Sequence, residues 1–85
     1  MPMSKQEKLI NRLLSKPKDF EWAEAVSILE SMGFEIIKGG GSRRKFLHKE
    51  SKTVISLHEP HPGKIMKTYA IQEIISALTE GGFLK

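Results

Sequence analysis

The stretch Gly39-Gly40-Gly41-Ser42-Arg43-Arg44-Lys45-Phe46 decides the fold, because a glycine-rich turn leads directly into a basic strand that continues to His48. Phe46 is the clearest inward-facing residue of that strand. A β-rich segment at 53–58 follows the polar turn at 49–52, and another precedes the glycines at 34–38. Two tight turns between three short strands predict an antiparallel, three-stranded sheet.

Helical patterns flank these strands. The first is expected over 4–16, from the capping box Ser4-Lys5-Gln6-Glu7 to Pro17. Asp19 is the expected N-cap of a second helix, which stops at Gly33. Thr68 is the expected N-cap of a last helix, which ends at the Gly-Gly pair at 81–82. The order α-α-β-β-β-α predicts an α+β fold with the helices on one face of the sheet. We expect a single domain over 1–85.

The composition narrows the class of protein. The chain has 85 residues and no cysteine, which excludes disulfides and thiolate metal sites. No signal peptide or membrane-spanning run is apparent, so we expect a soluble, cytoplasmic protein that does not bind membranes. The three histidines lie close together but lack the spacing of a helical metal site. We therefore expect no metal and no cofactor.

Positive charge is concentrated in the middle of the chain. The formal net charge is +4, but residues 38–68 alone hold eight Lys or Arg residues against two Glu, a local excess of six. Such a patch attracts polyanions, of which nucleic acid is a common one. A merely solubilising surface is the alternative interpretation of this charge.

Side-chain alternation predicts which residues share a face of the sheet. If Phe46 faces the helices, His48 does so too, and Arg43 and Lys45 lie on the open face. If Ile55 and Leu57 also face the helices, Ser56 and His58 share that open face. One cation of the triplet 43–45 then points inward or to an edge, with Glu35 as its candidate partner. Trp22 and Tyr69 are expected in the core or at its edge, and not as platforms for base stacking.

Several motifs together carry a family resemblance over residues 19–84. They are the helix that exits through Met-Gly-Phe at 32–34, Gly41-Ser42 before the second strand, His61-Pro62-Gly63-Lys64 before the last helix, and the Gly-Gly-Phe-Leu ending at 81–84. These residues resemble the HicA toxin family, whose fold is similar to double-stranded-RNA-binding domains. The helix at 4–16 is additional to the minimal family pattern. The resemblance implies a metal-independent mRNA endonuclease, neutralised by a HicB-type antitoxin.

The candidate site follows from this resemblance and from the chemistry of RNA cleavage. Family members have a histidine directly after Gly-Ser, where this chain has Arg43. Arginine stays protonated and suits charge stabilisation, so His58 and His61 are the candidates for proton transfer. Arg43, His58 and His61 form the predicted catalytic set. The predicted RNA-binding residues are Ser42, Arg44, Lys45, Lys64 and Lys67, of which the last two flank the start of a helix.

Alternatives remain open at this point. A protein of this fold without the family histidine can bind RNA without cleaving it. A protein-interaction domain with an acidic partner is a further alternative. The sequence also leaves open the oligomeric state, and whether the helix at 4–16 packs on this chain, on a second copy or on a partner.

Overall fold

The computed structural model describes residues 5–61 and 63–84, so the predicted cap Ser4 and the motif residue Pro62 lie outside the described residues. The described part confirms the predicted α+β order. Its elements are α1 (Lys5–Leu14), α2 (Trp22–Ser31), β1 (Glu35–Lys38), β2 (Arg43–His48), β3 (Thr53–His58) and α3 (Thr68–Glu80).

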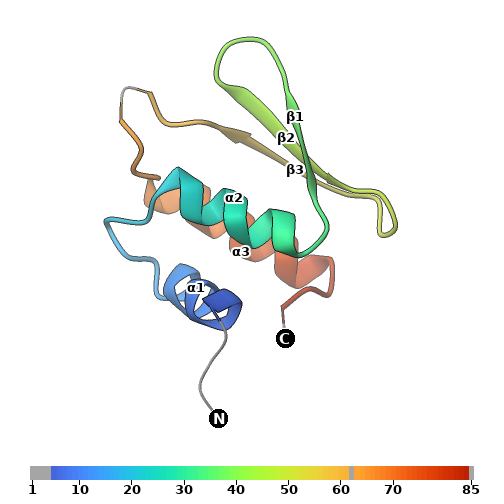
Figure 1. Ribbon diagram of the computed structural model, residues 1–85, viewed down its shortest axis with the longest axis horizontal. Helices are drawn as coiled ribbons and strands as arrows, with labels where there is room; N and C mark the ends of the chain where they lie inside the picture. The colour runs from blue at the N-terminus through green and yellow to red at the C-terminus, as the bar shows by residue number, and fades with distance from the viewer. Residues whose placement is uncertain (1–4, 62, 85) are drawn as a thin grey trace.

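The three strands form one antiparallel sheet in the order β1-β2-β3 (Figure 1). In its middle, Phe46 pairs with Ile36 on one side and with Ile55 on the other. The turn between β1 and β2 uses Gly41 at φ +60°, a conformation that glycine adopts without steric cost. The glycine run therefore sets where the hairpin reverses, and with it the register of the basic strand.

Helices α2 and α3 cover one face of the sheet (Figure 1). Phe46 is fully buried under this layer, and the Trp22 ring lies with its centroid 5.7 Å from that of Phe46. The apolar stripes of the helices supply the rest of this core, through Ala25, Ile28, Leu29, Ile71, Ile74 and Leu78. The opposite face of the sheet carries no helix in the described structure, as the sequence predicted.

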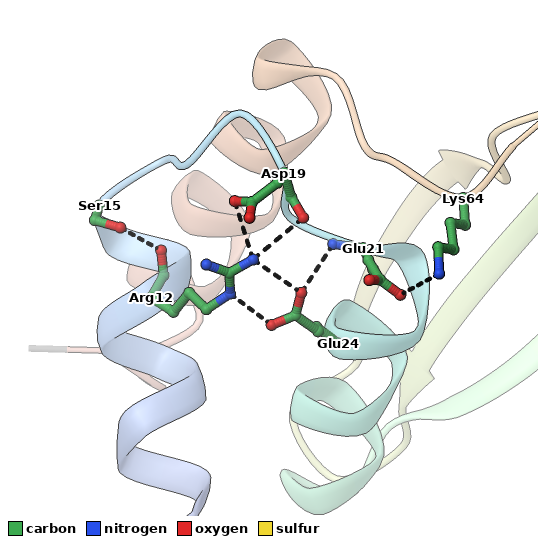
Figure 2. Close-up of polar contacts among 6 residues, drawn as sticks. All are labelled: Arg12, Ser15, Asp19, Glu21, Glu24 and Lys64. Carbon is green, nitrogen blue, oxygen red and sulfur yellow. Dashed lines mark hydrogen bonds and ion pairs between the residues drawn. The ribbon is translucent and has the colours of Figure 1, made fainter.

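Helix α1 packs on this chain, against α2 and α3 and on their side away from the sheet (Figure 1). Leu13 is fully buried there. The Arg12 guanidinium links α1 to α2 and to the loop between them, because Nε donates to Glu24 Oε2 at 2.7 Å and an Nη donates to Asp19 Oδ1 at 3.1 Å (Figure 2). Of the three arrangements that the sequence left open for this helix, packing on its own chain is therefore the one that the structure has.

Three predicted helix boundaries need correction. Helix α1 ends at Leu14, two residues before Lys16, which has a positive φ of +51° and is therefore outside the helical conformation. The cap of α2 is Glu21, whose N–H donates to Glu24 Oε1 at 3.0 Å, while Asp19 binds Arg12 instead. Lys67, and not Thr68, occupies the N-cap position of α3.

Candidate nucleic-acid interface

The candidate site lies where the start of β2, the end of β3 and the start of α3 meet. The antiparallel register places Arg43 opposite His58. The Glu59 N–H donates to the carbonyl oxygen of Ser42 at 2.8 Å, which extends this pairing by one step beyond the strands. Ser42 Oγ lies 3.3 Å from His58 Nδ1, within hydrogen-bonding distance. Local strand pairing therefore fixes the serine and the histidine side by side.

A hollow of ≈ 290 Å³ opens beside this pair. It brings together four of the predicted site residues, which come from the turn before β2, from β3, from the loop after β3 and from the N-cap of α3. A second hollow of ≈ 540 Å³ adjoins it and shares Ser42 and His61 in its lining. The residues that line the first hollow are Ser42, His58, Glu59, Pro60, His61, Ile65, Met66, Lys67, Tyr69 and Ala70.

Two cations of β2 occupy the open face next to the hollow. Arg43 and Lys45 are both exposed, and the register sets Lys45 opposite Ser56 and Arg43 opposite His58. The parity prediction for the open face is confirmed at these four positions. Positive charge thus continues from the hollow across the uncovered side of the sheet, where a phosphate backbone can reach it.

Arg44 faces the other way and is largely buried. Its Nε donates to Glu59 Oε1 at 3.1 Å, and its side chain is 15% exposed. An Nη of the same guanidinium donates to the carbonyl oxygens of Gly41 and Arg43. The prediction that Glu35 would pair with the inward cation is wrong, because Glu35 lies near Lys49 instead. Arg44 therefore links the glycine turn to the loop that follows β3.

Lys64 does not line the hollow. Its Nζ is 3.6 Å from Glu21 Oε1, at the start of α2 (Figure 2). The same segment is anchored through its backbone, since the Trp22 N–H donates to the Lys64 carbonyl and the Met66 N–H donates to the Phe20 carbonyl, both at 2.8 Å. Of the two predicted helix-flanking lysines, only Lys67 lines the hollow.

His48 is separated from the other two histidines. It lies on the covered side of the sheet, with ring centroids 5.3 Å from Phe34 and 4.8 Å from Phe83. Its Nδ1 is 2.9 Å from Ser51 Oγ in the adjoining turn. This histidine is thus part of the packing, in agreement with its predicted parity.

The prediction that Tyr69 lies in the core or at its edge is wrong. Its side chain is not at the core edge but 61% exposed, and it lines the hollow. The helical pattern could have predicted this exposure, because Tyr69 lies two positions before Ile71 and therefore off the apolar stripe of Ile71, Ile74 and Leu78. By contrast, the prediction for Trp22 at the edge of the core is confirmed.

Within residues 5–61 and 63–84 no three His, Asp or Glu side chains are grouped so that they could hold a metal ion. No helix of this same part is long and apolar enough to cross a bilayer.

The family follows from comparison with known proteins. A family model described as "HicA toxin of bacterial toxin-antitoxin" matches residues 22–81, from the start of α2 to the end of α3. The chain belongs to the HicA toxin family. No curated protein and no solved structure gave a match. HicA family toxins pair with antitoxins in toxin–antitoxin systems, and helix α1 precedes the matched region of this HicA chain.

Proposed function

We propose that this HicA family member is an endoribonuclease that cleaves mRNA without a metal ion and is neutralised by a HicB-type antitoxin. The observation that carries the proposal is the hollow in which His58, His61, Ser42 and Lys67 meet beside the exposed Arg43. Two titratable imidazoles and flanking cations are the groups that RNA cleavage by its own 2′-hydroxyl requires.

The proposed reaction is an internal transesterification. One imidazole, in its neutral form, accepts the proton of the 2′-hydroxyl as the 2′-oxygen forms a bond to phosphorus. The bond from phosphorus to the 5′-oxygen breaks, and the second imidazole, in its protonated form, donates a proton to that oxygen. The products are a 2′,3′-cyclic phosphate and a free 5′-hydroxyl. His58 and His61 are the two histidines that line the hollow, and together they fill both roles.

The remaining polar groups have roles in orientation and charge. Ser42 Oγ contacts His58 Nδ1, so the hydroxyl orients the ring and leaves Nε2 for substrate. Arg43 and Lys67 offset the charge that develops on the phosphorane, the role for which the fixed charge of arginine is suited. Arg44 holds the glycine turn against Glu59 and acts through positioning.

The antitoxin is proposed to cover the open face of the sheet. The exposed Arg43 and Lys45 lie on that face, and an acidic surface of the partner is complementary to them. Covering this face also blocks access to the hollow, because Arg43 is paired with His58 in the sheet. Inhibition and substrate binding then compete for the same cations.

The test is cleavage of end-labelled single-stranded RNA by the purified protein in excess EDTA. We expect defined fragments from the wild type and a loss of about 10²–10⁴-fold in rate for His58→Ala and for His61→Ala, the usual contribution of general acid–base catalysis. Ser56→Ala is the matched control, because Ser56 is exposed on the same strand as His58 but outside the hollow. Equal activity of wild type and both histidine variants would refute the site.

A second candidate function is RNA binding without cleavage. The observation that favours it is Arg43, which occupies the position of the family histidine and cannot serve as a base. Under this alternative the same RNA shifts on a native gel but stays intact. A protein-interaction domain would give neither a shift nor fragments, even at low salt.

A further inference from the structure

The rim of the hollow carries an aromatic ring that the proposed chemistry does not use. Tyr69 is the second residue of α3 and is 61% exposed, although the next two residues, Ala70 and Ile71, are buried. The backbone that carries the ring is thus held by the core, while the ring itself is presented to solvent at the hollow. Rigidly mounted, exposed aromatic rings are the surfaces on which proteins stack unpaired bases.

The lining around Tyr69 has an apolar part and a part with polar and charged side chains. Pro60 and Ile65 add apolar surface to the ring, and Ile65 is 43% exposed. The segment that carries Ile65 is fixed by its bridge to Glu21 and by the flanking backbone hydrogen bonds to Phe20 and Trp22. The hollow therefore offers an apolar wall for a base next to the histidines and Lys67, which suit a phosphate.

We propose that Tyr69, supported by Ile65, stacks on one unpaired RNA base and so makes the hollow select single-stranded over double-stranded RNA. In a duplex, both faces of each base are already covered by neighbouring bases, and only the phosphates remain accessible to the cations. The fold by itself gives no such preference, since related folds bind duplex RNA through backbone contacts. This inference rests on the proposed function, because it names the form of RNA that enters the same site.

The size of the effect follows from the stacking itself. One base on an aromatic side chain changes the dissociation constant by about 5- to 150-fold, as alanine substitutions at such platforms show. Because the ring is uncharged, its removal leaves the salt dependence of binding unchanged. Tyr69→Phe keeps the aromatic face and loses only the hydroxyl, so it separates stacking from hydrogen bonding.

The experiment measures fluorescence anisotropy with a labelled 2′-O-methyl RNA, which cannot be cleaved by its own 2′-oxygen, as a single strand and as a duplex. We expect Tyr69→Ala to weaken single-strand binding by about 5- to 150-fold, with duplex binding unchanged. Tyr69→Phe and the control Leu14→Ala, an exposed residue of α1, are expected to bind as the wild type does. Thermal melting verifies that each variant is folded.

Three results would overturn the inference. They are single-strand binding by Tyr69→Ala equal to wild type, equal losses in Tyr69→Phe and Tyr69→Ala, or equal losses for single strand and duplex. These results leave cleavage by His58 and His61 standing. If the wild type binds neither form of RNA, the proposed function and the stacking site fail together, and the EDTA cleavage assay shows this independently.

Discussion

Removing three exposed cations at the site should change the salt dependence of RNA binding by a calculable amount. The variant is Arg43→Gln/Lys45→Gln/Lys67→Gln. Arg43 and Lys45 lie on the open face of the sheet, and Lys67 lies at the rim of the hollow. None of the three forms an ion pair within residues 5–61 and 63–84, so each is available for a phosphate.

The magnitude follows from counterion release. Each phosphate neutralised on a single strand contributes about 0.7 to the slope of log Kobs against log salt, so three contacts contribute about 2.1. Between 50 and 200 mM salt, a fourfold change, this slope corresponds to a factor of about 18 in affinity. We therefore expect the wild type to lose about 18-fold more affinity than the variant over that range.

The assay is anisotropy titration of a labelled single strand at several salt concentrations. The matched control is Lys5→Gln/Lys8→Gln/Lys18→Gln, which removes the same total charge from exposed positions on α1 and the following loop. The control is expected to retain the wild-type slope. A site variant with the wild-type slope, or equal loss of slope in both variants, would refute the localisation of phosphate contacts.

Three further predictions concern the scaffold. Leu13→Ala should lower the free energy of unfolding by about 2–5 kcal/mol, because Leu13 of α1 is fully buried against the other helices. A loss of less than about 1 kcal/mol, measured by urea titration, would argue against this packing. Gly33→Ala should cost about 1–2 kcal/mol, since Gly33 has φ +98° and an added Cβ would lie 3.2 Å from His48 Nε2; an unchanged melting temperature would contradict it. The hydrogen bond from Arg12 lowers the pKa of Glu24 below its ordinary value of 4.5, so Glu24 stabilises the fold above that pH and the contribution disappears as the pH falls through the lowered pKa. Melting temperatures measured as the pH falls below 4.5 should therefore decrease less steeply for Glu24→Gln than for the wild type, and parallel curves in that range would contradict this.

Strand parity was predictable from the sequence because it depends on local features. The glycine run fixes the hairpin, Phe46 indicates which side of β2 meets the helices, and Ile55 and Leu57 indicate it for β3. These features predicted Arg43 and His58 on the same face of the sheet, whereas their direct pairing became evident only from the register. Helix stripes such as Ile71, Ile74 and Leu78 were equally visible.

Contacts between distant segments were not predictable in the same way. The partner of Arg44 depends on how the loop after β3 turns, and it is Glu59, 15 positions away, and not the cross-strand candidate Glu35. The isolation of Lys64 from the hollow depends on its bridge to α2, for which the local sequence gives no sign. Tyr69 differs from these, because its position off the helical stripe could have been recognised.

The central claim is that His58 and His61 exchange the protons of RNA cleavage, and the pH dependence of cleavage tests it most directly. Initial rates of cleavage in EDTA are measured from about pH 4.5 to 8.5, around the ordinary imidazole pKa of about 6.5, for the wild type and for each single histidine variant. We predict a bell-shaped profile for the wild type, and the loss of one limb in each variant. A wild-type profile that is flat through this range, or that keeps both limbs in both variants, would contradict the account.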